Sequence, residues 1–232
     1  MTVTERWKEA QVAETEFWTG LSPESIQQIL QVNQSYARRL QEWVPEKASP
    51  ALEIGVGGLG VGLLGYVPSI VTRVAVDPLP QVRPSCPEAM LQEILTRRDA
   101  LQFARASGES LPFASGQFAL VVCVNVLDHV REAPEVVAEI FRVLRPGGLF
   151  FLGVDTFSYF GLAKWHLLTK HLHANEIMVR AHPYRFLASH VADLVRASGF
   201  APLRVDSRGF VEQWIGHSRM THFLFQKPTI AT

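Results

Sequence analysis

Cysteine is almost absent from this chain of 232 residues, which contains only Cys86 and Cys123. Cys86 lies in a proline-rich loop and Cys123 in an apolar run, so the pair does not resemble the disulfide framework of small secreted proteins. The scarcity of cysteine instead fits a reducing compartment, and we expect a cytoplasmic protein.

The chain also lacks an excess of charge of either sign. Its 22 Lys and Arg residues balance its 22 Asp and Glu residues, which gives a formal net charge of zero. A strongly basic chain would suggest a nucleic-acid partner, and none is expected here. The composition does not define the oligomeric state.

Long hydrophobic runs are missing as well. The longest, such as LFFLGV at 149–154, are far shorter than the roughly 20 residues that a membrane-spanning helix needs. The N-terminal sequence has no apolar segment typical of a signal peptide and too many acidic residues for a transit peptide. We therefore expect no membrane span. Hydrophobic residues still make up 47% of the chain, enough for a sizeable core.

What is present is an alternation of apolar and helical segments. Short apolar runs at 51–55, 71–77, 118–126 and 149–155 read as buried strands, and amphipathic segments such as 133–144 separate them. Strands that are apolar on both faces and separated by helices indicate a parallel sheet covered on both sides. The pattern predicts a doubly wound α/β fold.

Two segments fall outside this alternation. Residues 1–48 are polar and helical in pattern, with Ser22 as a helix N-cap and Pro23 at the first helical position. They predict an N-terminal helical cap in front of a domain at 49–232. Residues 156–185 are too many for a simple crossover, and long insertions at this edge of a sheet are usually lids or binding loops. We interpret them as a substrate lid.

The stretch LEIGVGGLG at 52–60 places four glycines in nine positions beside the acidic Glu53. Glycine weakens a strand or helix interior by roughly 0.5–1 kcal/mol relative to alanine, so the cluster indicates a tight turn or a close ligand. It follows a strand, at the sheet edge where doubly wound folds bind ligands. Asp77 ends the next strand, where its carboxylate can accept hydrogen bonds from two ribose hydroxyls or cap a helix. An adenosine-type ligand is predicted.

The glycines alone leave the kind of adenosine ligand open. Gly55, Gly57 and Gly60 also match GxGxxG, the dinucleotide fingerprint, so an NAD(P)-dependent oxidoreductase is an alternative. Glu53 stands where dehydrogenase strands normally carry an apolar residue, and the helical residues 1–48 precede the strand. Both features argue against that alternative.

Four motifs then occur in an order and at spacings that resemble a known family. LEIGVGGLG, VAVDPLP, GESLPFASGQFALVVCVNVLDHV and EIFRVLRPGGLF resemble the class I S-adenosylmethionine-dependent methyltransferases, in particular the branch of the ubiquinone and menaquinone C-methyltransferases. The resemblance covers about residues 50–155. It implies a Rossmann-like, seven-stranded, mostly parallel sheet flanked by helices, with the last strand antiparallel. It also implies S-adenosyl-L-methionine as cofactor, S-adenosyl-L-homocysteine as product and a small or lipid-like acceptor.

The resemblance also implies roles for individual residues. In that family the glycine loop meets the methionine part of the cofactor, the acid after the second strand binds the ribose, the next loop holds the adenine, and the end of the fourth strand faces the sulfonium. The corresponding residues here are Glu53, Gly55 and Gly57; Asp77; Ser107, Gly108 and Glu109; and Asn125.

Three positions depart from the family pattern. Leu59 replaces the third glycine of the loop, Ser107 replaces an acid at the adenine position, and Ala119 replaces the aspartate usual before the fourth strand. Neither the ribose acid nor the pair Gly55 and Gly57 is affected. The departures leave a catalytically silent cofactor-binding protein as a second alternative.

The family has no fixed catalytic residue, because methyl transfer depends mainly on positioning. In the insertion, Tyr159, His166 and His182 are candidates for orienting or deprotonating the acceptor, and its aromatic residues could cover a hydrophobic or aromatic acceptor. The N-terminal aromatics are expected to close the other side of the acceptor, and these are Trp7, Phe17, Trp18 and Trp43. His129 is interpreted as structural. No metal site is expected, because His171 and His173 cannot share one helix face.

Overall fold

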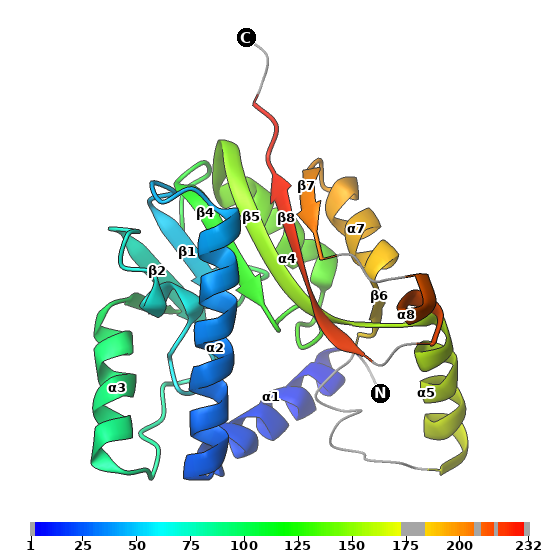
Figure 1. Cartoon of the computed structure of the whole chain (residues 1–232), viewed down its shortest axis with the longest axis horizontal. Helices are drawn as coiled ribbons and strands as arrows, with labels where there is room; N and C mark the ends of the chain where they lie inside the picture. The colour runs from blue at the N-terminus through cyan, green and yellow to red at the C-terminus, as the bar shows by residue number, and fades with distance from the viewer. Residues whose placement is uncertain (1–2, 173–183, 207–209, 216–217, 230–232) are drawn as a thin grey trace.

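The computed structural model describes residues 3–172, 184–206, 210–215 and 218–229. In Figure 1 a central sheet runs through the molecule with helices on both of its faces. The strands are β1 (Ala51–Ile54), β2 (Arg73–Asp77), β3 (Gln102–Arg105), β4 (Phe118–Val124), β5 (Leu144–Phe157), β6 (Phe186–Leu187), β7 (Ala201–Val205) and β8 (Arg219–Gln226).

The strand order is β3-β2-β1-β4-β5-β8-β7, and the two-residue β6 pairs with β5 off this path. Pairing is parallel between the neighbours from β3 to β5, and β8 is antiparallel to both β5 and β7. The predicted mostly parallel sheet with an antiparallel last strand is therefore confirmed. The order reverses direction between β1 and β4, which is where doubly wound folds bind ligands.

The helices are α1 (Val3–Thr19), α2 (Pro23–Trp43), the 3-10 helix η1 (Leu63–Tyr66), α3 (Glu88–Asp99), α4 (Ala133–Val143), α5 (Tyr159–Leu172), α7 (Ala188–Ala197) and α8 (Phe210–Ile215). Among the helices within the described ranges, none combines the length and the hydropathy of a membrane-spanning segment.

Alternating residues of the buried strands divide the core between the two faces of the sheet. In β4, Val121 and Cys123 share a cluster with α4 and α7, whereas Leu120 and Val122 share one with α2 and η1. Side chains of a strand alternate between its faces, so a strand covered on both sides must be apolar throughout. All seven residues of β4 are buried, as this arrangement requires.

The N-terminal helices contact the sheet domain in different ways. The predicted cap of α2 is confirmed, since Ser22 Oγ accepts a hydrogen bond from the backbone N–H of Ser25 at 3.2 Å and Pro23 begins the helix. The buried side chains of α2 join the core of one sheet face. Helix α1 instead crosses below the carboxyl ends of the parallel strands (Figure 1).

Two elements differ from expectation. A doubly wound sheet normally has a helix after its first strand, but the segment 58–66 forms a turn followed by the single turn of η1. Strand β7 was not predicted, because all five of its residues are exposed and its apolar pattern is correspondingly weak. The predicted insertion, 156–185, begins in the last residues of β5 and continues into α5.

Candidate cofactor site

The glycine loop after β1 adopts backbone conformations that favour glycine. Gly55, Gly57 and Gly60 have φ angles of 79°, 61° and 64°. A Cβ atom built on Gly55 would lie 2.2 Å from Cγ2 of Val126, and one on Gly60 would lie 2.7 Å from Nε2 of Gln81. The left-handed backbone and the close neighbours both require glycine, so the loop is a tight turn in contact with its surroundings.

Glu53 lies behind this loop, and its carboxylate binds the backbone of η1. Oε1 accepts a hydrogen bond from the N–H of Leu63 at 2.7 Å, and Oε2 accepts one from the N–H of Leu64 at 2.8 Å. The side chain is only 1% exposed, and burial raises the pKa of its carboxyl to about 7 against the opposing effect of the two N–H groups. The first two N–H groups of η1 are therefore already bonded to a carboxylate of the chain itself.

Asp77 joins the end of β2 to the glycine loop. Its Oδ2 accepts a hydrogen bond from the N–H of Gly57 at 2.7 Å, and its Oδ1 accepts one from the N–H of Leu79 at 2.8 Å. Burial raises the pKa of this carboxyl, and the N–H groups of Leu79 and Gly57 oppose that rise. Each carboxylate oxygen has a second lone pair, so Asp77 retains the capacity to accept hydrogen bonds from a ligand.

The predicted adenine loop is tied to the start of α4. Ser107 Oγ is hydrogen-bonded to the carboxylate of Glu109, whose Oε1 accepts hydrogen bonds from the N–H groups of Arg131 at 2.8 Å and Glu132 at 3.4 Å. A carboxylate at a helix N-terminus is stabilised by the helix dipole. Gly108 packs closely, because a Cβ built there would lie 3.2 Å from Cγ1 of Val136.

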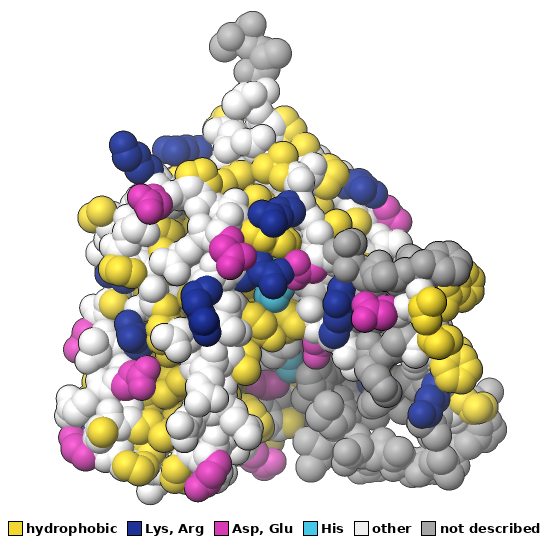
Figure 2. Space-filling view, in the orientation of Figure 1, with side chains coloured by type: hydrophobic (Ala, Val, Ile, Leu, Met, Phe, Trp, Pro, Cys, Tyr) yellow, Lys and Arg dark blue, Asp and Glu magenta, His cyan; other side chains and the backbone are white. Residues whose placement is uncertain are grey.

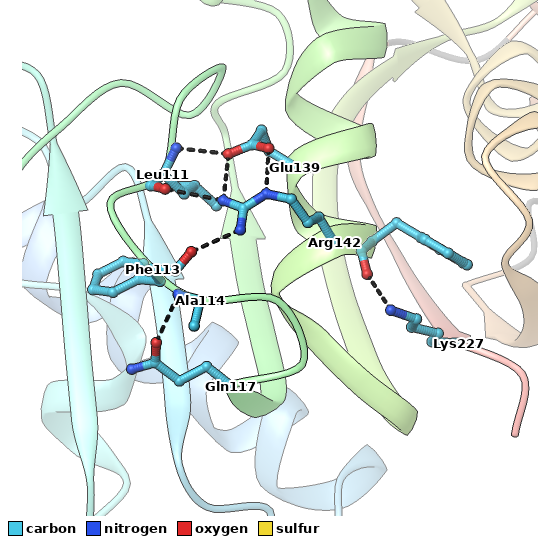
Figure 3. A network of polar contacts seen from close by, with 8 residues as sticks. Leu111, Phe113, Ala114, Gln117, Glu139, Arg142 and Lys227 are labelled. Atoms are coloured by element: carbon cyan, nitrogen blue, oxygen red, sulfur yellow. Dashed lines mark hydrogen bonds and ion pairs between the residues drawn. The ribbon is translucent and has the colours of Figure 1, made fainter.

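An arginine on α4 fixes the chain that follows this loop (Figure 3). Arg142 donates hydrogen bonds to the carbonyl oxygens of Leu111 at 3.0 Å and Phe113 at 2.7 Å. It also pairs with Glu139, whose Oε2 accepts a hydrogen bond from the N–H of Leu111 at 2.8 Å. The Arg142 guanidinium lowers the pKa of the Glu139 carboxyl. These bonds hold residues 111–113 against α4.

Asn125 follows β4 in a left-handed conformation, with φ of 57°. Within the described part of the chain it is the only residue other than glycine with a positive φ. Its N–H donates to the carbonyl oxygen of Gly153 at 2.8 Å, while its side chain is exposed. Asparagine tolerates this conformation better than most residues, and such outliers gather at functional sites.

Helix α1 reaches the glycine loop with Trp18, a contact that the sequence did not specify. A Cβ built on Gly57 would lie 2.2 Å from Cζ2 of the Trp18 indole, and one built on Gly58 would lie 2.6 Å from Trp18 Cβ. Glu14 of the same helix has Oε1 3.0 Å from Nδ1 of His129, in the segment after β4. The sequence predicted that N-terminal aromatics close the other side of the acceptor, but it gave no signal for the contact of Trp18 with the glycine loop or of Glu14 with His129.

The catalytic candidates of the insertion are only partly covered by the structure. Tyr159 is 39% exposed, and its ring lies 4.9 Å from that of Trp214 on α8, centroid to centroid. The side chain of His166 and the whole of His182 lie outside the described residues, as do the side chain of His171 and all of His173. Among the side chains that are described, no three His, Cys, Asp or Glu residues could hold a metal ion.

Residues 52–152, which contain the glycine loop, Asp77, the predicted adenine loop and Asn125, match a family model described as a methyltransferase domain. This part of the chain is similar to a methyltransferase domain. The strand order of the sheet is compatible with that match.

Two curated relatives are similar to part of this chain. An uncharacterized methyltransferase of Mycolicibacterium vanbaalenii is 35% identical over 101 residues, 44% of this chain and 37% of that protein. The human thiol S-methyltransferase TMT1A is 34% identical over 145 residues, which is 56% of either chain. The matches thus span between 37% and 56% of these relatives' lengths.

A solved structure supports the same fold. A Thermotoga maritima protein, described as an S-adenosylmethionine-dependent methyltransferase and possible histamine N-methyltransferase, aligns with a TM-score of 0.57 at 19% sequence identity. The alignment covers 84% of this chain and 89% of that one. The methyltransferase fold therefore extends well beyond residues 52–152.

Proposed function

We propose that this protein transfers the methyl group of S-adenosyl-L-methionine to a small or lipid-like acceptor. One observation carries the proposal. Asp77 and the left-handed Gly57 meet at the carboxyl edge of the sheet through a 2.7 Å hydrogen bond, inside the segment that matches the methyltransferase domain. The strand order reverses direction at the same place.

The residues around this edge fit the parts of that cofactor. Gly55 and Gly57 would admit the methionine part to the backbone, and the remaining lone pairs of Asp77 would bind the ribose hydroxyls. The loop of Ser107, Gly108 and Glu109 would hold the adenine. Asn125 would lie beside the reactive sulfur, and Glu53 would shape the loop from behind.

Glu53 argues against the dinucleotide alternative. A dinucleotide places its pyrophosphate at the N-terminus of the helix after the first strand, where free N–H groups bind it. In this chain the N–H groups of Leu63 and Leu64 are bonded to the Glu53 carboxylate, and a single 3-10 turn stands in place of the helix. A pyrophosphate would have to displace this internal acid.

Little covalent chemistry is asked of the protein in such a reaction. When bound, S-adenosylmethionine supplies a methyl group that its sulfonium has already activated. The protein must hold donor and acceptor in line, and orientation of this kind can contribute roughly 7–11 kcal/mol. A general base is needed only where the acceptor has a proton to lose.

The proposed acceptor is hydrophobic or aromatic. Helices α5 and α8 present an apolar surface, visible at the right of Figure 2, made of Tyr159, Phe160, Leu167, Val211, Trp214 and Ile215. Helix α5 follows the carboxyl end of β5 in the chain. The lid proposed for 156–185 therefore begins at the same edge of the sheet as the glycine loop. The C-methyltransferase branch remains part of this proposal, and thiols join the acceptors to be tested because the human relative is a thiol S-methyltransferase.

The proposal is tested by measuring which of two adenosine-containing ligands stabilises the protein. We expect S-adenosylhomocysteine to raise the melting temperature and NAD to leave it unchanged, since a ligand at a hundred times its Kd stabilises by roughly 2.7 kcal/mol. Transfer of a radiolabelled methyl group to a thiol, a quinol or an extract component would then separate an enzyme from a silent binding protein. Stabilisation by NAD instead would contradict the proposal.

The lid is tested with a single substitution on α5. Tyr159→Ala removes the ring that packs on Trp214, and we expect methyl transfer to fall at least about tenfold while the Kd for S-adenosylhomocysteine stays constant. Val71→Ala, at a residue that is 83% exposed and outside 156–185, is the matched control. Full activity of the Tyr159 variant would rule out the lid role of this ring.

A further inference from the structure

Helix α1 lies on the part of the site that the cofactor is proposed to use. The indole of Trp18 approaches so closely that its Cζ2 would be 2.2 Å from a Cβ on Gly57. The glycine loop contacts Val126 at Gly55 and Gln81 at Gly60, whereas at Gly57 and Gly58 the nearest neighbour is Trp18. Glycine lets a ligand approach the backbone closely, and at Gly57 and Gly58 helix α1 occupies that space.

A second contact holds α1 across the site. The indole Nε1 of Trp18 donates a hydrogen bond to Oε2 of Glu14 at 3.1 Å, and Oε1 of Glu14 lies 3.0 Å from Nδ1 of His129. The helix therefore contacts the loop after β1 through Trp18 and the segment after β4 through Glu14. These two segments form the two sides of the proposed cofactor site.

Few of the described side chains of α1 are buried, although Trp18 packs against the core cluster that contains Leu59. Among the α1 side chains that the structure describes, only Ala10 is fully buried, and Val12 and Phe17 are 59% and 54% exposed. Glu14 is also close enough to Asp77 for its negative charge to contribute to the raised pKa of that carboxyl, after the larger effect of burial. Segments with little buried apolar surface open at low free energy.

From these contacts we propose that α1 is an internal competitor of the cofactor, with the Trp18 indole occupying the open side of Gly57 and Gly58 until the helix moves away. The inference rests on the proposed function. A chain with two such states binds a ligand with an apparent Kd equal to the intrinsic Kd divided by the fraction of open chains. Contacts that hold α1 down therefore weaken binding, and removing them strengthens it.

The test compares variants of the full chain by calorimetric titration with S-adenosylhomocysteine. Trp18→Ala removes the competing ring, and we expect the Kd to fall by at least about tenfold, since minor states of this kind are commonly populated at 0.1–10%. Val12→Ala, on an exposed part of the same helix, makes a comparable gain in helix propensity and should leave the Kd unchanged.

A second pair of variants gives an answer even if Trp18→Ala fails to fold. Glu14→Gln weakens the link to His129 and should tighten binding by up to about fivefold, whereas Glu16→Gln, at an exposed position of α1, should have no effect. An unchanged or weaker affinity in both Trp18→Ala and Glu14→Gln would overturn the competitor and leave the proposed function standing. Absence of binding in the wild type and in every variant would overturn both.

Discussion

Alanine in place of Asp77 is expected to weaken S-adenosylhomocysteine binding by at least about a hundredfold. The substitution would remove two hydrogen bonds from ribose hydroxyls to a charged acceptor, each worth roughly 1.5–3 kcal/mol, and every 1.4 kcal/mol is a factor of ten in Kd. Calorimetric titration of the folded variant measures the loss directly. Asp193→Ala, which removes a carboxylate from a side chain that is 72% exposed on α7, should bind as the wild type does.

The same substitution should also lower the free energy of unfolding. Asp77 accepts hydrogen bonds from the N–H groups of Gly57 and Leu79, and a buried donor left without an acceptor costs roughly 1–3 kcal/mol. Asp77→Asn, which keeps one carbonyl oxygen, should lose less stability than Asp77→Ala. If the folded alanine variant bound S-adenosylhomocysteine with unchanged affinity, Asp77 would be a backbone anchor and no ribose ligand.

The elements that sequence could predict are those whose apolar residues repeat with a clear period. Helix α4 places Val136, Val137 and Ile140 on one buried face, and β4 is apolar throughout because helices cover it on both sides. Strand β7 lies at the edge of the sheet with all five residues exposed, so burial imposed no pattern on it. The 3-10 geometry of η1 depends on Glu53, ten residues before Leu63, and local propensity does not contain that contact.

The candidate site also contains residues that the sequence could predict and contacts that it could not. Glycine is the residue that a left-handed turn requires, so Gly55 and Gly57 were recognisable from the sequence, and so was the acid at the end of β2. The contact of Trp18 with Gly57 depends on how a separate helix docks on the finished sheet. An amphipathic pattern indicates that a helix docks, but it does not say which residue meets which loop.

Alanine at Gly57 should lower the affinity for S-adenosylhomocysteine by at least about a hundredfold, and a second glycine provides the control. Gly57 and Gly116 have similar left-handed backbones, with φ of 61° and 72°. A residue with a side chain costs roughly 1–2 kcal/mol in that conformation, so both variants should carry the same backbone cost. Only at Gly57 would the new methyl group lie where the cofactor is proposed to approach the backbone.

The space around the two glycines separates backbone strain from loss of the site. A Cβ built on Gly116 has Arg145 Cα at 3.9 Å as its nearest neighbour, an ordinary contact, so Gly116→Ala should melt lower but bind normally. At Gly57 the same atom would meet Trp18, so Gly57→Ala should displace α1 as Trp18→Ala does. Because the methyl group also fills the space that the cofactor needs, displacing α1 should bring no gain in affinity. Equal binding by Gly57→Ala and Gly116→Ala would place the cofactor elsewhere on the sheet edge.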